Sequence, residues 1–404
     1  MKNTHESKLS MNFRQIPKSF IREILDVADQ KNIISFAGGL PNPDYFPVKE
    51  LTHSANEVFS QFGSLLLQYA GSQGYFPLRE WIANRYSKKY NQPISPDNIV
   101  ITNGSQQTID IVSKMFLDQG DGVIVEKPTY LGGIQALSAY SPEFLEVDLR
   151  SNGPNLEQIE AHCMNHVPKF MYSIPNFQNP SGICHSAESR KKLAFLLKTY
   201  NLLMLEDDPY NEIRFKGEEL PPLFHLAPDQ VIWTGSFSKM VAPGLRMGWV
   251  ILPDHLVVPF IRAKQSTDLH SNNLSQYILH HYLTNNNIDD HLQRIRKAYR
   301  EQSEFMLQMI REHFPESIKS TAPEGGMFLW LTLPKTINAD ELISRCLEKG
   351  VAFVPGTSFF TSANGVHNIR MNFSNSSFEK IEKGIKLMAL ELKKVKNQKV
   401  SFVV

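Results

Sequence analysis

The feature that most constrains the fold is an alternation of short apolar runs with amphipathic segments through the first two thirds of the chain. Each run is apolar along its whole length, which is typical of strands buried on both faces. Strands that alternate with helices predict a mainly parallel sheet with a layer of helices on either side. We therefore predict a three-layer α/β fold, with strands at 98–102, 122–126, 144–148, 170–174, 202–206, 231–234 and 249–252.

The two ends of the chain differ from this pattern. Near the N-terminus, a polar arm precedes an expected helix over residues 19–30 and a short strand at 33–36. Near the C-terminus, strands and helices follow one another in an arrangement that predicts a smaller α+β domain. The predicted division is an arm and helix that join the small domain, a large domain and the small domain itself, over residues 1–50, 51–300 and 301–404.

The composition excludes several classes of function. Lys and Arg number 42 against 41 for Asp and Glu, so nothing favours a nucleic-acid partner or an anionic membrane surface. The three cysteines lack the C-x-x-C spacing of a redox or zinc motif. No uninterrupted apolar run approaches the ~18 residues that a membrane-spanning helix needs. A cytoplasmic protein without a membrane partner is expected.

One segment combines groups that could hold a phosphorylated aldehyde. Ser236, Ser238 and Lys239 are followed by a Pro-Gly turn and Arg246. A lysine amine forms a Schiff base with an aldehyde, while hydroxyls and a guanidinium bind phosphate. Taken alone, the segment also fits a surface lysine in a serine-rich loop.

Other polar groups also follow predicted strands. Asp207-x-x-Tyr210 places a carboxylate and a phenol at a strand end, and a carboxylate that faces a pyridine nitrogen keeps it protonated. Asn179 lies in an Asn-Pro-Ser-Gly turn, and Gly104 lies in a turn that leads into a helix whose N-terminus could bind an anion. Each of these could instead be an ordinary turn or cap.

Taken together and in order, these motifs are more specific. The set Asn179-Pro-Ser-Gly, Asp207-x-x-Tyr210, Ser236-x-Ser238-Lys239, Pro243-Gly-Leu-Arg246 and Ile369-Arg370 resembles the class I, fold type I, pyridoxal-phosphate-dependent aminotransferases. The segments Phe36-Ala-Gly-Gly-Leu-Pro41, Leu67-Gln-Tyr69 and Gly104-Ser-Gln-Gln107 are similar to the branch that contains the 2-aminoadipate, kynurenine and aromatic aminotransferases.

The resemblance implies a role for each matched residue around pyridoxal 5'-phosphate. Lys239 would form the Schiff base and move the substrate proton, Asp207 would pair with the ring nitrogen, and Tyr210 with Asn179 would bind the ring oxygen. Tyr130 would stack on the ring. The phosphate would be held by Gly104, Ser105, Gln106, Ser236, Ser238 and Arg246. Tyr69 would reach the phosphate of the neighbouring subunit, which implies a homodimer with shared active sites.

The same resemblance bears on the substrate. Arg370, helped by the backbone of Gly39 and by Asn179, would bind the α-carboxylate of an amino acid or a 2-oxo acid. Arg22 would meet a distal carboxylate, which makes glutamate and 2-oxoglutarate the expected donor and acceptor. Arg22 could also be a solvated helix residue.

Three functions fit these observations. The favoured hypothesis is transamination of 2-aminoadipate or of an aromatic or large apolar L-amino acid. A carbon–sulfur β-lyase would use the same cofactor, and a non-enzymatic effector-binding domain would need a helix-turn-helix, for which the segment before Phe36 is expected to be too short. No metal is expected, because His162 and His166 have a chelating spacing but no further matched ligands.

Overall fold

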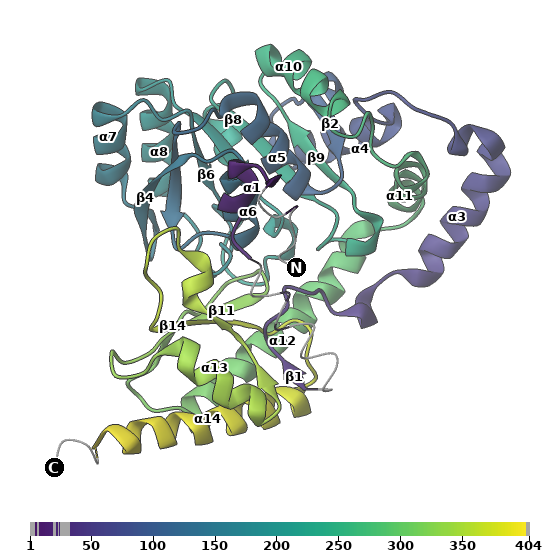
Figure 1. The fold of residues 1–404 in the computed structure, drawn as a ribbon. Coiled ribbons are helices and arrows are strands. Elements are labelled where there is room, and N and C mark those ends of the chain that lie inside the picture. The colour runs from purple at the N-terminus through teal and green to yellow at the C-terminus, as the bar shows by residue number, and fades with distance from the viewer. Residues whose placement is uncertain (1–4, 6–7, 19–21, 23, 25–32, 401–404) are drawn as a thin grey trace.

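The computed structural model describes residues 5, 8–18, 22, 24 and 33–400, with side chains as far as residue 395. Figure 1 shows a large body beside a smaller one that contains the C-terminal helix. The helix predicted over residues 19–30 lies outside the described residues, apart from Arg22 and Ile24, which are helical. In the described chain we find no helix with the length and apolarity needed to span a membrane.

The large body is built on an eight-stranded sheet of order β2-β9-β8-β7-β6-β3-β4-β5. Neighbouring strands from β8 through β4 pair in parallel, whereas β9 is antiparallel to both of its neighbours. This order confirms the predicted mainly parallel sheet. The strands are β2 (Ile99–Thr102), β3 (Gly122–Lys127), β4 (Glu143–Arg150), β5 (Gly153–Pro154), β6 (Phe170–Ser173), β7 (Leu203–Asp207), β8 (Val231–Ser236) and β9 (Gly248–Ile251).

Strand β9 reverses direction because a short connection joins it to β8. That connection contains only the 3-10 turn η6 (Pro243–Leu245), and a parallel return would need a crossover of a dozen or more residues. As β2 is antiparallel to β9, it runs the same way as β8.

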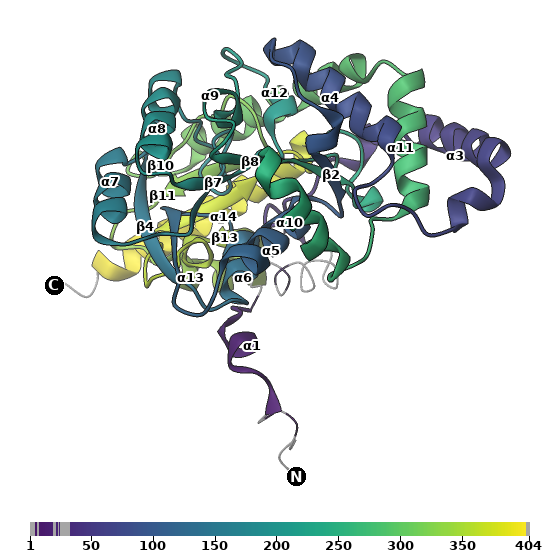
Figure 2. The ribbon, with the colours of Figure 1, turned by 90° about the horizontal axis from the view of Figure 1, so that it is seen from above.

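Helices cover both faces of this sheet, as predicted (Figure 2). One layer contains α5 (Ser105–Phe116), α6 (Leu131–Ser138) and α10 (Asp254–Gln265). The other contains α7 (Leu156–Asn165), α8 (Ala187–Thr199) and α9 (Leu223–Leu226). Beyond the β2 edge lie α3 (Val48–Phe62) and α11 (Asn273–Asn285), whereas α4 (Phe76–Tyr90) packs through Tyr86 against Trp233 of β8 and Trp249 of β9.

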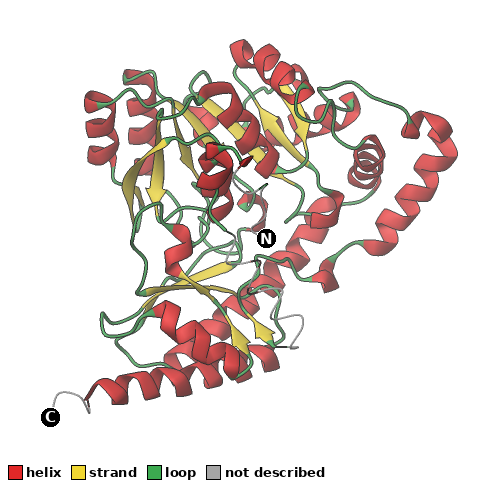
Figure 3. Cartoon of the chain, in the orientation of Figure 1, coloured by secondary structure: helices red, strands yellow, loops and turns green. Residues whose placement is uncertain are grey.

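The smaller body combines an antiparallel sheet with helices that pack beside it (Figure 3). Its sheet has the order β10-β11-β14-β13, and β1 (Ile34–Ser35) pairs in parallel with β12 (Val351–Ala352). The remaining elements are β10 (Lys319–Ser320), β11 (Phe328–Thr332), β13 (Val354–Pro355), β14 (Asn368–Asn372), α12 (Ile288–His313), α13 (Ala339–Glu348) and α14 (Phe378–Val400).

The domain boundaries themselves stay predictions. The N-terminal segment reaches the small body through β1, while helix α12 runs without a break through residue 300. A short helix, α1 (Met11–Gln15), forms within the arm because the Ser10 hydroxyl accepts a hydrogen bond from the amide of Phe13.

The topology gathers the ends of several strands at one edge of the large sheet. Strands β2, β3, β6, β7 and β8 are parallel, so the segments that follow them meet there. Asp207 and Ser236 are the last residues of β7 and β8. The loops that contain Gly104, Tyr130 and Asn179 follow β2, β3 and β6, which places most of the predicted site along this edge.

Candidate functional site

Lys239 lies just beyond β8, and its amine points toward the N-terminal segment. Its Nζ donates a hydrogen bond of 2.9 Å to the carbonyl oxygen of Gly39. Burial, together with the charges of Arg246 and Arg370, lowers the pKa of the Lys239 amine to about 8. A large fraction of this amine is therefore neutral near pH 8, and the neutral form is the nucleophile.

Asp207 presents a carboxylate with one unsatisfied oxygen. Its Oδ2 accepts a hydrogen bond of 2.9 Å from the Tyr172 hydroxyl, while no donor in the described part of the chain has normal hydrogen-bond geometry to Oδ1. Burial raises the pKa of Asp207 to about 7, against the opposing effect of the Tyr172 and Ser105 hydroxyls. A cationic N–H placed against Oδ1 would both satisfy that oxygen and favour its charge.

Asn179 links two other predicted residues. Its Nδ2 lies 3.5 Å from the Tyr210 hydroxyl, and its Oδ1 accepts a hydrogen bond of 2.9 Å from Arg370. Burial raises the pKa of the Tyr210 phenol. Tyr210 is therefore a neutral hydrogen-bond donor at ordinary pH.

Arg370 projects from β14 of the small sheet toward this cluster. One guanidinium nitrogen donates to Asn179 and the other donates to the carbonyl oxygen of Ala37 at 2.6 Å. Its guanidinium carbon lies 4.3 Å and 4.9 Å from the ring centroids of Phe328 and Phe359. A guanidinium held on both sides in this way offers a carboxylate a fixed fork of donors.

A loop cluster rich in donors lies at the β2 and β8 ends of this edge. Arg246 donates to the carbonyl oxygen of Asn103 at 3.1 Å, and the amide of Ser238 donates to the Ser236 hydroxyl. Gly104 has φ +86°, and a Cβ built on it would lie 3.1 Å from the Arg246 guanidinium. Helix α5 begins directly afterwards at Ser105, and the free amide groups of such a helix start can bind an anion.

Tyr130 and Gln106 border this cluster. Burial and the charge of Asp207 raise the pKa of the Tyr130 phenol, and the charge of Arg22 is among those that oppose the shift. Arg22 is exposed, yet it lies close enough to act on Tyr130. The Gln106 side chain donates to the carbonyl oxygen of Gly132 at 2.7 Å, which joins the starts of α5 and α6.

Tyr69 is 80% exposed on the segment after the 3-10 turn η3 (Gly63–Leu67). Its ring packs edge-on against His270, with 5.8 Å between the ring centroids. Tyr69 therefore presents its hydroxyl end to the outside of the subunit.

The sequence reasoning missed several residues that complete the site. Tyr172 points at Asp207 from the neighbouring strand, and Phe328 and Phe359 support Arg370. Which tyrosine contacts Asp207 depends on the register of β6 against β7, and residue types alone do not predict that register. The two phenylalanines look like ordinary core residues in the sequence.

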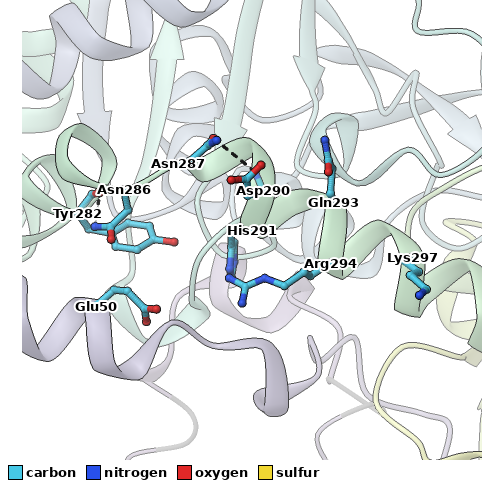
Figure 4. A pocket seen from close by; sticks show the side chains of 9 residues that line it. All are labelled: Glu50, Tyr282, Asn286, Asn287, Asp290, His291, Gln293, Arg294 and Lys297. Carbon is cyan, nitrogen blue, oxygen red and sulfur yellow. Dashed lines mark hydrogen bonds between the residues drawn. The ribbon is translucent and has the colours of Figure 1, made fainter.

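A separate polar groove of about 620 Å³ lies where α3 faces α11 and α12 (Figure 4). Its lining includes Glu50, Tyr282, His291 and Arg294, and burial with the charge of Arg294 lowers the pKa of His291. Of the residues predicted for the site, none that the structure describes lines this groove. In the same described residues, no group of three His, Cys, Asp or Glu side chains is placed to hold a metal ion.

Comparison with known proteins identifies the class to which this fold and site belong. The profile of the family described as aminotransferase class I and II matches residues 31–387. The aromatic-amino-acid aminotransferase 1 of Thermococcus litoralis is 38% identical over 93% of this chain and 91% of its own. The 2-aminoadipate transaminase of Thermus thermophilus is 38% identical over 94% of this chain and 95% of its own.

A solved structure gives the same result. An α-aminoadipate aminotransferase from Thermus thermophilus, complexed with N-(5'-phosphopyridoxyl)-L-leucine, superposes with a TM-score of 0.90 at 36% identity. The alignment covers 97% of this chain and 99% of that one. The chain therefore belongs to the class I and II aminotransferase family and has the fold type I architecture. The resemblance to the 2-aminoadipate, kynurenine and aromatic aminotransferase branch is likewise confirmed.

Proposed function

We propose that this aminotransferase uses pyridoxal 5'-phosphate to exchange the amino group between an L-amino acid and a 2-oxo acid. The amino donor is 2-aminoadipate or an aromatic or large apolar amino acid. The 2-oxo acid that accepts the amino group is 2-oxoglutarate, which becomes glutamate. The observation that carries the proposal is the convergence of the Lys239 amine, the unsatisfied Oδ1 of Asp207 and the Arg370 fork between the two bodies.

These groups fit pyridoxal phosphate. The buried Oδ1 of Asp207 lacks the donor that a protonated ring nitrogen would supply, and Arg246 with the start of α5 forms a cradle suited to a phosphate. When bound, the cofactor supplies an electrophilic aldehyde carbon and a protonated ring that withdraws electrons from the substrate α-carbon.

The protein's own groups would then hold and move protons. Asp207 would keep the proton on the ring nitrogen, because the cationic N–H would favour the anionic carboxylate and oppose the burial that raises its pKa. Tyr210 and Asn179 would donate hydrogen bonds to the ring oxygen. Lys239, with a pKa lowered to about 8, is suited to take a proton from the substrate α-carbon and return it as a general acid–base group.

Substrate binding would rest on two arginines. Arg370 is held in place by Asn179 and Ala37 and would bind the α-carboxylate. Arg22 would bind a distal carboxylate, as in glutamate or 2-aminoadipate. Its support is the effect of its charge on Tyr130, which would stack on the cofactor ring.

We also propose a cytoplasmic homodimer in which Tyr69 serves the site of the partner subunit. The exposed apolar side chains of Leu65 and Leu67 lie beside Tyr69, and a partner surface would bury all three. The free state of Cys163, Cys184 and Cys346 suits a reducing compartment.

A spectral assay tests this function. The holoenzyme is mixed with single amino acids, and absorbance reports conversion of the pyridoxal form of the cofactor to the pyridoxamine form. Glutamate, 2-aminoadipate and aromatic amino acids are expected to convert it, and 2-oxoglutarate is expected to reverse the change. Lys239→Ala should lose turnover by about a hundredfold or more.

The same assay separates the alternatives. Pyruvate and ammonia released from a sulfur amino acid without an oxo-acid acceptor would favour a β-lyase. Amino acids that bind without any half-reaction would favour an effector-binding role and would contradict the proposal.

A further inference from the structure

An ion pair between a buried lysine and a partly buried aspartate lies behind the loop assigned to the cofactor phosphate. The side chain of Lys264, near the end of α10, has no exposed surface. Its ammonium contacts both carboxylate oxygens of Asp268 at 2.9 and 3.0 Å, the Ser271 hydroxyl at 3.0 Å and the Gln107 amide oxygen at 3.2 Å. The ammonium therefore has acceptors for all of its hydrogens, and its orientation is fixed.

Asp268 contacts the loop between β2 and α5 as well as Lys264. Its Oδ2 accepts a hydrogen bond of 2.7 Å from the Asn103 side chain and another of 2.7 Å from the Gln107 side chain. The Gln107 amide oxygen in turn accepts from the backbone amide of Asn103 at 2.8 Å. Asn103 is thus held through its side chain and its backbone.

Asn103 connects the Lys264–Asp268 pair to the phosphate cradle. The carbonyl oxygen of Asn103 accepts a hydrogen bond of 3.1 Å from the Arg246 guanidinium. Gly104 and the start of α5 follow Asn103 directly in the chain. A shift of Asn103 would therefore move Arg246 and the amides of Ser105 and Gln106 together.

The energetics argue that this pair has more than a stabilising role. Burying the Lys264 ammonium costs several kcal/mol, and well-packed apolar side chains often replace such a pair without loss of stability. What an apolar pair could not supply is a fixed anionic acceptor for Asn103 and Gln107. The lysine also cancels the charge of Asp268, which would otherwise repel a phosphate in the adjacent loop.

We propose that the Lys264–Asp268 pair is a positioning element that sets the geometry of the phosphate cradle. The inference rests on the proposed function, since it requires a phosphorylated cofactor in that loop. Neither residue touches the cofactor, and both act through Asn103 and Gln107.

The test compares two ligands that differ only in the phosphate. Apoenzyme is prepared from the holoenzyme and titrated with pyridoxal 5'-phosphate and with pyridoxal, and absorbance gives the two dissociation constants. A double variant, Lys264→Met with Asp268→Asn, removes both charges together and so leaves no unpaired buried ion. Its thermal unfolding is recorded to show that it is folded.

Asp254→Asn is the matched control. Asp254 starts the same helix, α10, and its carboxylate accepts a side-chain amide hydrogen bond of 2.6 Å from Asn98, just before β2. The control removes one carboxylate charge beside β2 while it keeps an amide oxygen that can accept from Asn98, at the end of α10 away from the phosphate loop.

The double variant is expected to weaken binding of the phosphorylated ligand by about tenfold or more and to leave pyridoxal binding nearly unchanged. Asp254→Asn should alter neither constant. An equal loss for both ligands, or no loss, would overturn the inference. If the wild-type apoenzyme fails to bind pyridoxal phosphate in preference to pyridoxal, the proposed function fails instead.

Discussion

Three consecutive acidic residues at the end of β7 show how contacts, rather than residue type, single out a functional group. Glu206 accepts two backbone amide hydrogen bonds of 3.0 Å, from Leu223 and Phe224. Asp208 accepts from the side chains of Asn176 and Trp233. Asp207 is as buried as its neighbours but keeps one oxygen without a partner, and it alone of the three is suited to a ligand N–H.

Asp207→Asn is expected to lower kcat by about a hundredfold or more, because an amide cannot hold the proton on the ring nitrogen. The matched variant is Tyr172→Phe, which removes the donor to Oδ2 and leaves the carboxylate in place. It should cost about tenfold, the lower end of the value of one hydrogen bond to a charged group. Single-turnover kinetics with a good amino donor would measure both. Equal losses would contradict the role given to Asp207.

The lowered pKa of Lys239 predicts a pH dependence for cofactor loading. Lys239 attacks an aldehyde only when neutral, and its neutral fraction rises as the pH passes its pKa of about 8. The loading rate of the apoenzyme, divided by the rate for a free lysine derivative under the same conditions, should be constant below about pH 8 and should fall between about pH 8 and about 10.4, the pKa of a free lysine amine. A ratio that stayed constant through about pH 10 would mean that the amine is unperturbed.

At the scale of elements, the strand-to-helix turn at Gly104 is the part of the site that depends most on the backbone. Gly104 combines φ +86° with ψ 166°, a region open almost only to glycine. A Cβ built on Gly104 would also lie 3.1 Å from the Arg246 guanidinium. Both conditions must hold for α5 to begin where its amides would face the phosphate in the proposed site.

Gly104→Ala should therefore destabilise the protein by about 1–3 kcal/mol and weaken binding of pyridoxal phosphate. Gly244→Ala is the control, because a Cβ there meets no atom within 4 Å and its φ is not in the left-handed region. Thermal unfolding and cofactor titration of both variants give the comparison. A Gly104→Ala protein as stable as the control would refute the strain argument.

The elements also show what could be read from the sequence. Apolar runs such as 202–206 and 231–234 predicted β7 and β8, because burial on both faces leaves a clear pattern. The same pattern predicted that Asp207 lies where a strand ends. The Tyr172 contact did not, because it depends on how β6 and β7 are aligned, and the Lys264–Asp268 pair depends on the packing of α10 beside β2.

For the whole molecule, the site lies between two bodies that are far apart in the sequence. Arg370 from β14 bonds to Asn179 beyond β6, and the Gly39 carbonyl meets Lys239 across 200 residues of chain. Tyr69 faces outward beside the exposed Leu65 and Leu67. A site shared between subunits would explain why a residue predicted to bind phosphate lies on the outer surface.

A complementation experiment tests the shared site. The Lys239→Ala protein lacks the amine, and Tyr69→Phe should weaken cofactor binding by about tenfold through loss of one hydrogen bond to a charged phosphate. Hybrid dimers of the two, isolated with different affinity tags, are assayed at a cofactor concentration below the dissociation constant of the Tyr69→Phe protein.

If Tyr69 serves the site of the partner subunit, one site of the hybrid has both Lys239 and a tyrosine supplied by the other chain. That hybrid should show about half of the wild-type activity, since one of two symmetric sites is restored. If Tyr69 serves its own subunit, the hybrid has no complete site, because one chain lacks the amine and the other lacks the hydroxyl. Its activity would then be no higher than that of the Tyr69→Phe protein. The hybrid assay thus separates a shared site from two independent ones without requiring either single variant to be wholly inactive.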